Sequence, residues 1–304
     1  MIQSLADGIL SGSIISLGAI GLTMVMHTLR FANFSHAELL SLGAYIALVF
    51  DGVFSALLPV LSTSLGGLSL TWGLLLAFPV ALLITGFSAM IIDRWVFKRI
   101  REKGEELSMV FASFGVALII RNALGLMFGL ETQLYSDDIA FAMLLSQDPL
   151  LIVKPDQVFV LGLTAVIMVL LHLMLSKTTF GYSLRAVAEN PTLAAVSGVD
   201  LKRVIATIWI LGGGLAAAAG IFYGLTNNIS PIMGRDLVLP IFAATIVGGI
   251  GSIYGAVLGG FIVGLAANMA LLILPSGYSP AVPFLIILAV LLVRPNGLFG
   301  EARS

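Results

Sequence analysis

Long apolar runs recur along this chain of 304 residues, and they decide what it can fold into. Several exceed roughly 18 residues, the length that a helix needs to cross the hydrocarbon core of a bilayer. Inside lipid, only helices and closed barrels satisfy every backbone polar group, and these continuous runs differ from the short alternating strands of a barrel. We therefore predict an all-α fold, a polytopic membrane helical bundle.

The runs predict about eight transmembrane helices and one shorter piece. Residues 237–250 form an apolar run of about 14 residues, which is too short to span comfortably and predicts a half-helix or re-entrant segment. The whole chain, 1–304, is expected to form one transmembrane domain. The predicted spans are approximately 5–29, 36–61, 70–92, 109–130, 158–175, 204–225, 253–274 and 281–293.

Charged residues make up only 10% of the chain, so their positions are informative. Residues 93–107 hold five Lys or Arg side chains and residues 176–203 hold four, which predicts that both loops are cytoplasmic. The loop between them is acidic and is expected on the far side of the membrane. This pattern does not fix the side of the N-terminus. The acidic residues of the far-side loop are Glu131, Asp137, Asp138, Asp148 and Asp156.

Composition and motifs exclude several classes of function. The net charge is −1, so no global field favours nucleic acid. Cysteine is absent and the three histidines show no ligand spacing, so no metal site is expected. The sequence also lacks the nucleotide-binding, zinc-protease and nucleophile-elbow motifs. We expect no cofactor on this chain, and any ATP used must be bound by another chain.

The stretch FANFSHAE, residues 31–38, interrupts the apolar pattern between the first two predicted spans. Ser35 and Glu38 fit the capping box S-x-x-E, which predicts a helix that begins there with Ser35 as its cap. Asn33 and His36 are not used by that motif. The charge pattern of the later loops places this break towards the cytoplasmic side.

Two further polar interruptions lie within apolar runs. Arg121 and Asn122 are about twelve residues into their span, past the middle of the bilayer. An ionisable residue there is a functional candidate, and the alternative is that Arg121 extends to the outer interface as an anchor. Asn227 and Asn228 interrupt the chain near the outer end of a later span. Interrupted hydrophobic segments are typical of transport sites.

Small residues recur at helical spacing, most clearly at Gly251, Gly255 and Gly259. Such stripes let helix backbones approach closely where lipid gives no hydrophobic drive to pack. The favoured interpretation is tight packing within the bundle. The alternative is a sliding surface for alternating access.

The loop at about 176–203 is the longest internal cytoplasmic segment, and it contains helix signals. Asn190 and Pro191 read as a cap followed by proline at the first helical position. Gly198 ends that helix, and Asp200 caps the next one. The loop is therefore predicted to form two short helices.

The first of these predicted helices is amphipathic. Leu184, Val187 and Ala188 form one apolar face, while Arg185 and Glu189 stand four apart on another. A short amphipathic helix on the cytoplasmic side is shaped to enter the groove of a partner protein. The alternative is a helix that lies on lipid headgroups.

Four blocks of the sequence, in this order and spacing, resemble a known family. They are GLTMVMHTLRFANFSHAELLSLGAY (21–45), FGYSLRAVAENPTLAAVSGVDLKRVIA (180–206), FAATIVGGIGSIYGAVLGGFIVGL (242–265) and LLVRPNGLFG (291–300). Together they resemble the permease subunits of branched-chain amino-acid ABC importers, and in particular the smaller, H-type permease. Ala37 stands where the family often has glycine. The family also includes urea and short-chain amide permeases.

The resemblance implies a set of partners and a location. The expected partners are a second related permease, two cytoplasmic ATPases that use ATP, and a periplasmic solute-binding protein. The expected location is the bacterial inner (plasma) membrane, with lipid around the chain. The resemblance also implies that Asn33, His36 and Glu38 shape the pathway or its gate. It places the coupling to the ATPase at Tyr182, Leu184, Arg185, Ala186, Glu189, Asn190 and Pro191.

We therefore expect a permease that translocates branched-chain or other aliphatic amino acids, or else urea or an amide. An ion-coupled secondary transporter would need carboxylates inside the membrane, and Glu38 and Asp51 are the exceptions among acids that otherwise lie mostly in loops. A membrane-embedded enzyme would need a nucleophile with a base, or a metal cluster. Neither pattern is visible in the sequence.

Overall fold

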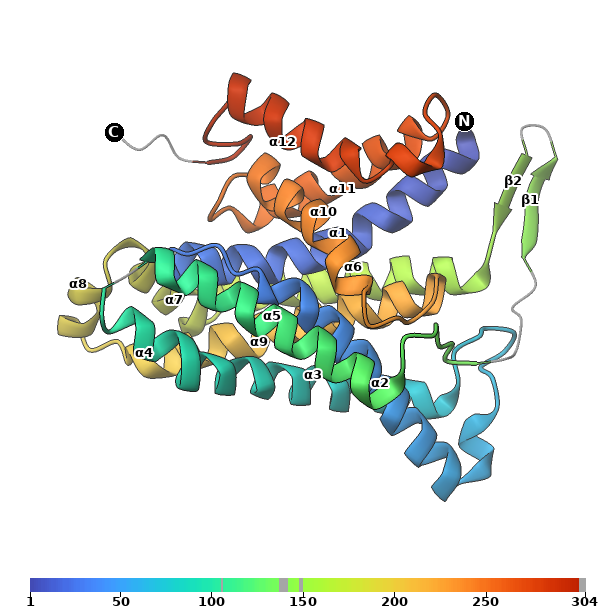
Figure 1. Ribbon diagram of the computed structural model, residues 1–304, viewed down its shortest axis with the longest axis horizontal. Helices are drawn as coiled ribbons and strands as arrows, with labels where there is room; N and C mark the ends of the chain where they lie inside the picture. The colour runs from blue at the N-terminus through green and yellow to red at the C-terminus, as the bar shows by residue number, and fades with distance from the viewer. Residues whose placement is uncertain (105, 137–141, 148–149, 301–304) are drawn as a thin grey trace.

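The computed structural model is a bundle of long helices with one short β-hairpin (Figure 1). It describes residues 1–104, 106–136, 142–147 and 150–300. Asp137, Asp138 and Asp148 of the acidic loop lie outside the described residues. The elements are α1 (Ile2–Leu29), α2 (Ser35–Leu57), η1 (Pro59–Ser62), α3 (Trp72–Ile92), η2 (Asp93–Phe97), α4 (Lys98–Arg101), α5 (Glu106–Phe128), β1 (Met143–Gln147), β2 (Leu150–Val153), α6 (Pro155–Lys177), α7 (Thr179–Glu189), α8 (Pro191–Val196), α9 (Leu201–Thr226), α10 (Met233–Gly248), α11 (Ile253–Ala270), η3 (Ser276–Tyr278) and α12 (Ala281–Val293).

Within the described ranges, seven helices are long and apolar enough to cross a membrane, and α12 is a shorter apolar helix. These helices confirm the prediction of an all-α membrane bundle with about eight spans. The predicted short segment is α10, which has 16 residues. The chain after α3 was predicted to be a loop, but it stays helical to Arg101 because its apolar residues continue to Phe97. Antiparallel strands β1 and β2 within the far-side loop were also not predicted.

The two ends of the bundle differ in charge, and this difference orients the chain. Segments α4, α7 and α8, which belong to the two basic regions, gather at one end, and the hairpin lies at the other (Figure 1). The side-chain oxygen of Gln3 accepts a hydrogen bond from the backbone N–H of Ile152, at 3.0 Å, so the N-terminus lies at the hairpin end. The backbone N–H of Leu298 donates to the carbonyl of Val247 at 2.8 Å, which holds the C-terminal tail at the cytoplasmic end of α10.

The loop on the far side is tied to the bundle by buried polar contacts. Asp156 is buried and accepts hydrogen bonds from the backbone and the hydroxyl of Ser69, at 2.9 and 2.6 Å. The hydroxyl of Tyr135 donates to the carbonyl of Ala44 at 3.0 Å, and burial raises the pKa of Tyr135 well above its usual range. Tyr135 therefore remains a hydrogen-bond donor at physiological pH. The connection between α2 and α3 is held in a similar way, because Asp51 of α2 accepts from Thr71, the residue that caps α3, at 2.7 Å.

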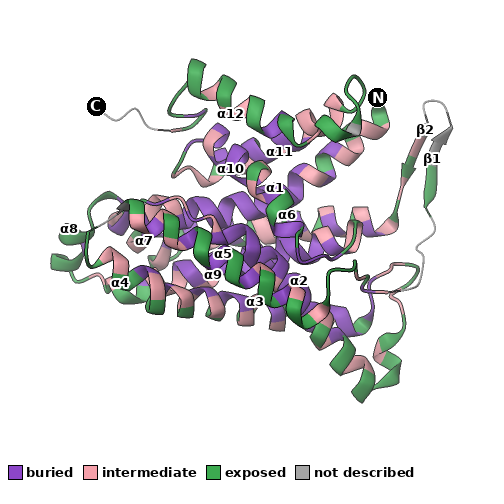
Figure 2. Cartoon of the chain, in the orientation of Figure 1, coloured by how far each residue is buried: buried purple, intermediate pink, exposed green. Residues whose placement is uncertain are grey.

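Helices α1 and α9 form the buried centre of the bundle, and α3 and α6 are more exposed (Figure 2). Small residues allow this arrangement. A Cβ atom on Gly220 of α9 would overlap the backbone of Leu40 in α2, and one on Gly264 of α11 would overlap Gly12 of α1. Backbones that approach this closely are typical of helix packing in lipid.

The glycines singled out in the sequence have two different settings. A Cβ on Gly255 would overlap the carbonyl of Gly248, and one on Gly259 would overlap that of Ala244, so α11 lies directly against α10. Gly251 was expected on the same helical stripe, but it lies in the turn before α11 with φ +102°. Its role is to make that turn possible, because other residues rarely adopt such an angle.

Candidate functional site

The break at FANFSHAE lies deep within the bundle. Helix α1 ends at Leu29, and Arg30 adopts a left-handed conformation with φ 57° that turns the chain back. The Nε2 atom of His36 then lies 3.1 Å from the carbonyl oxygen of Gly18 in α1. Gly18 precedes Leu29 by 29 − 18 = 11 residues, about 17 Å along the helix axis. Helix α2 therefore begins beside the middle of α1, deeper than the cytoplasmic side where the sequence placed it.

The depth was missed because the sequence alone does not distinguish a loop at the surface from one that folds back inward. Six residues of extended chain, from Arg30 to His36, reach about 20 Å, which is enough to return to the level of Gly18. Such irregular backbone is tolerated at membrane depth only where protein groups satisfy its N–H and C=O groups. The polar residues of the break provide such hydrogen-bonding groups.

The capping box predicted for Ser35 and Glu38 is wrong. Ser35 is the first residue of α2, and no side chain caps the helix from the preceding Phe34. Instead, the side-chain oxygen of Asn33 accepts hydrogen bonds from the backbone and the hydroxyl of Ser35, at 3.2 and 2.6 Å. The hydroxyl of Ser113 in α5 accepts from the backbone N–H of Phe34 at 3.0 Å. Asn33 and Ser113 thus complete the start of the helix.

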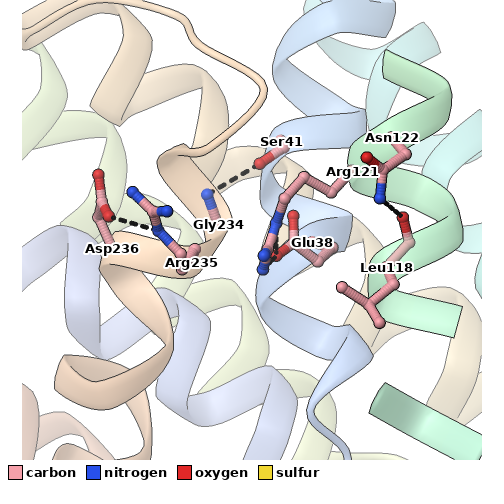
Figure 3. Close-up of polar contacts among 8 residues, drawn as sticks. All are labelled: Glu38, Ser41, Leu118, Arg121, Asn122, Gly234, Arg235 and Asp236. Carbon is pink, nitrogen blue, oxygen red and sulfur yellow. Dashed lines mark hydrogen bonds and ion pairs between the residues drawn. The ribbon is translucent and has the colours of Figure 1, made fainter. Parts of the chain in front are cut away.

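Glu38 is not used as a cap because it forms an ion pair with Arg121 of α5 (Figure 3). Both Nε and one terminal nitrogen of Arg121 donate to the same carboxylate oxygen, Oε1, with Nε at 3.0 Å. The Glu38 side chain is 2% exposed and that of Arg121 is 24% exposed. The alternative that Arg121 extends to the outer interface is therefore wrong. An ionic pair at this depth is the arrangement that a membrane interior requires of charged residues.

The second oxygen of Glu38, Oε2, faces the first turn of α10. It is buried without a hydrogen-bond partner among the described residues, as are Nδ1 of His36 and Nδ2 of Asn33. A Cβ on Gly234 would lie 2.8 Å from this oxygen, and the backbone N–H of Gly234 donates to Ser41 at 2.9 Å. Glu38 thus lies in the first turn of α2 and against the first turn of α10. Both helix N-termini carry partial positive charge, which favours a carboxylate here.

Three aromatic rings lie beside the break. Phe34 stacks on Phe114 of α5 with ring centroids 4.0 Å apart, and on Phe242 of α10 with centroids 4.6 Å apart. The three rings join α5, the break and α10. No local pattern marks this aromatic cluster, because its members are far apart along the chain and each lies in an ordinary apolar run.

Among the described residues, the side chains of the remaining polar candidates from the sequence form no hydrogen bond with Glu38 or Arg121. Asn122 points away from Glu38 and donates to the carbonyl of Leu118 on its own helix, at 2.7 Å (Figure 3). Asn227 is exposed at the end of α9 and donates to Tyr223 at 3.3 Å. Asn228 is exposed in the connection to α10.

Comparisons with known proteins show the family of the chain. The profile of the family described as "Branched-chain amino acid transport system / permease component" matches residues 4–291. The chain belongs to this family. The permease is 31% identical to the high-affinity branched-chain amino acid transport system permease protein LivH of Salmonella typhimurium, over 99% of this chain and 96% of that protein.

Two further relatives cover the permease to a similar extent. BraD of Pseudomonas aeruginosa, named as a high-affinity branched-chain amino acid transport system permease protein, is 28% identical over 99% of this chain and 96% of its own. A probable LivH of Methanocaldococcus jannaschii is 28% identical over 97% and 91%. No solved structure gives a significant match. The permease is a multi-pass membrane protein and a transport subunit.

The segment that was expected to couple to the ATPases, about 176–203, forms two short helices, α7 and α8, as predicted. The side chain of Asn190 accepts from the backbone of Leu193, so it caps α8 as expected. Leu184, Val187 and Ala188 are buried within the permease. The apolar face of α7 therefore faces neither a partner protein nor lipid, in contrast to both sequence interpretations.

The outward surface of this region consists of other side chains. Tyr182 is exposed, and the guanidinium of Arg185 lies 4.9 Å from its ring centroid. Glu189, Asn190 and Pro191 are also exposed, and Ala186 is half-buried. In α8, the apolar side chains of Leu193 and Val196 are exposed, which the sequence did not predict.

The segment formed by α7 and α8 contacts the end of α1. A terminal nitrogen of Arg30 donates to the carbonyl of Glu189, the last residue of α7, at 3.4 Å. A cavity of about 230 Å³ lies at this junction and is lined by Arg30, Arg101, Val187, Pro191 and their neighbours. The residue that begins the break is thus in direct contact with the last residue of α7.

Proposed function

We propose that this permease is the membrane-spanning subunit of an ATP-driven importer for branched-chain or other aliphatic amino acids. The observation that carries the proposal is the similarity to LivH and BraD over nearly the whole chain. The partners would be a second related permease, two cytoplasmic ATPases that hydrolyse ATP, and a periplasmic binding protein that delivers the solute. The permease itself would bind no cofactor and would reside in the inner (plasma) membrane.

The pathway or its gate would be formed at the break. Asn33, His36, Glu38 and Arg121 provide polar groups deep in the bundle, which a polar solute needs in order to cross lipid. They lie where two helices, α2 and α10, begin inside the membrane, an arrangement typical of transporter sites. Asn122, Asn227 and Asn228 are candidates for the outer part of the same route.

The ATPases would act on the exposed surface of α7 and α8. Tyr182, Arg185 and Glu189 present polar and aromatic groups there, and Leu193 and Val196 present apolar ones. Movement of this surface would reach the break through the contact between Glu189 and Arg30. Leu184 would hold α7 to the bundle, so that the helix moves with the permease.

The test is reconstitution of the permease with its partner subunits into liposomes. Labelled leucine should accumulate only when ATP, both ATPases and the binding protein are present. Accumulation that persists without the ATPases would contradict the proposal, as would uptake of labelled urea or acetamide but not leucine.

A further inference from the structure

The charge pair of Glu38 and Arg121 lies beside the three stacked rings of Phe34, Phe114 and Phe242. We propose that these five residues form a recognition site for a zwitterionic aliphatic amino acid within the permease. Arg121 would bind the α-carboxylate, Glu38 the α-ammonium, and the rings would contact the side chain. This inference rests on the proposed function and adds to it the groups that select the solute.

The two charges match the two charges of an amino acid. A free amino acid carries one ammonium and one carboxylate on the same carbon, and a neutral solute such as urea carries neither. In the structure, the guanidinium and the carboxylate neutralise each other, which offsets part of the cost of placing two charges in the membrane. A zwitterion can replace this contact with two equivalent ones, because it brings one charge of each sign.

Both partners of the pair keep unused bonding capacity. Arg121 directs Nε and one terminal nitrogen at a single oxygen, and a guanidinium has five N–H donors in all. Its side chain is 24% exposed and is thus not fully enclosed by the bundle, and a guanidinium can pair with a second carboxylate through its remaining donors. Glu38 keeps Oε2 without a partner among the described residues, although it is fully buried. A buried carboxylate oxygen without a donor carries a desolvation cost, which a donor on a ligand would relieve.

The rings are placed to contact the apolar part of the same solute. Phe34 precedes Glu38 by four residues, at the start of α2. Phe114 precedes Arg121 by seven residues on α5, so the ring and the cation lie on the same face of that helix. Phe114 is 45% exposed, which leaves part of the ring surface uncovered. A branched aliphatic side chain gains stability against such a surface.

The first turn of α10 controls access to Glu38. Gly234 covers Oε2, and the hydrogen bond from its backbone to Ser41 holds α10 against α2. The ammonium group can reach Oε2 only after this turn moves away. The structure is therefore the closed form of the site, and displacement of α10 would open it.

The experiment compares leucine uptake and ATP hydrolysis in the complete reconstituted transporter. The double variant Glu38→Gln/Arg121→Gln keeps a hydrogen-bonding pair of similar size without charge. We expect its uptake of labelled leucine to fall about a hundredfold, while ATP hydrolysis stimulated by the binding protein stays within about twofold of wild type. The control is Lys98→Gln/Glu102→Gln, which removes an exposed ion pair and should leave both rates unchanged.

Two further variants keep the inference testable if the double variant does not assemble. Arg121→Lys keeps the charge but loses the planar fork, so leucine uptake should fall about tenfold. Phe114→Ala should lower leucine uptake by a similar factor, whereas Phe111→Ala, at a more exposed ring on the same helix, should not.

The outcomes separate this inference from the proposed function. The recognition site is overturned if leucine uptake stays within about threefold of wild type in the double variant or in Arg121→Lys. The proposed function as an importer is not affected by that result. A wild-type transporter that hydrolyses ATP but takes up no leucine overturns the proposed function, and this inference with it.

Discussion

Asn33 and Ser113 show why a chain that is mostly apolar carries so many polar atoms at one point. Each accepts a hydrogen bond from a backbone N–H at the start of α2, within the bundle. Water could satisfy these groups at a surface, but lipid cannot. The same reasoning applies to Glu38, whose charge is balanced by Arg121 and favoured by two helix N-termini. The polarity of the break is therefore a structural requirement that also creates a polar site.

Replacing Ser113 tests this reasoning for a single hydrogen bond. Ser113→Ala leaves the part-buried N–H of Phe34 without its acceptor, so the permease should lose about 1–3 kcal/mol of stability. Ser88→Ala removes a hydroxyl that only bonds back to its own helix, and should change stability little. Thermal unfolding in detergent measures both, and equal midpoints for the two variants would argue against the role of Ser113.

Gly234 gives a second test at the same scale. In Gly234→Ala the new Cβ would lie 2.6 Å from the carbonyl of Ala37 and 2.8 Å from Glu38, so α10 must shift away from α2 at about 1–3 kcal/mol. Gly162→Ala, in α6, meets no atom within 4 Å and should be neutral or stabilising. The comparison uses thermal unfolding of the purified permease. A Gly234→Ala variant as stable as Gly162→Ala would show that the two helices are not in close contact.

At the scale of elements, the caps of the short cytoplasmic helices could be predicted from the sequence, but the burial of the apolar face of α7 could not. Asn190 and Asp200 cap helices exactly where local pattern indicated, because a cap depends only on neighbouring residues. The partner of the apolar face of α7 depends on where α1, α6 and α9 pass, which no local pattern encodes. Leu184 is therefore buried within the permease, and Leu193 is exposed instead.

This difference in burial predicts separate effects for two leucines, Leu184 of α7 and Leu193 of α8. Leu184→Ala opens a cavity in the bundle and should destabilise the permease by about 2–5 kcal/mol. Leu193→Ala should change stability by less than about 0.5 kcal/mol, but should weaken binding of the ATPases. Thermal unfolding of the permease alone and co-purification of the ATPases distinguish the two. Loss of ATPase binding with unchanged stability in Leu184→Ala would contradict the assignment.

The candidate site follows the same division between local and long-range information. Glu38 and Arg121 could each be picked out from the sequence, because an ionisable residue in an apolar run is conspicuous. That they pair could not, since they lie 121 − 38 = 83 residues apart and the depth of α2 was unknown. The aromatic stack was missed for the opposite reason, because phenylalanine in a membrane span carries no local signal.

At the scale of the whole molecule, the basic loops predicted the orientation, and the structure adds the side on which the N-terminus lies. The N-terminus lies at the hairpin end, and the C-terminal tail lies beside the opposite end of α10. The short helix α10 thus carries the chain back towards the cytoplasm. When α10 is counted as a segment that returns the chain to the cytoplasmic side, the basic regions and the C-terminal tail lie on the same side.

Cysteine labelling tests this orientation, and the natural absence of cysteine makes it direct. Ser62→Cys in η1 should react with a membrane-impermeant maleimide in cells with a permeabilised outer membrane and an intact inner membrane. Lys103→Cys, after α4, should react only when the inner membrane is opened. The reverse pattern would invert the orientation.

The central claim is that the break enters the membrane and meets α10 there. Crosslinking of a Phe34→Cys/Phe242→Cys double variant in native membranes tests it most directly, because the native rings stack at 4.6 Å. We predict that a short bis-maleimide joins the two cysteines, while Phe34→Cys/Phe54→Cys, with its second cysteine near the far end of α2, gives no such product. Efficient labelling of Phe34→Cys by an impermeant reagent from the cytoplasm, with no crosslink to position 242, would contradict the account.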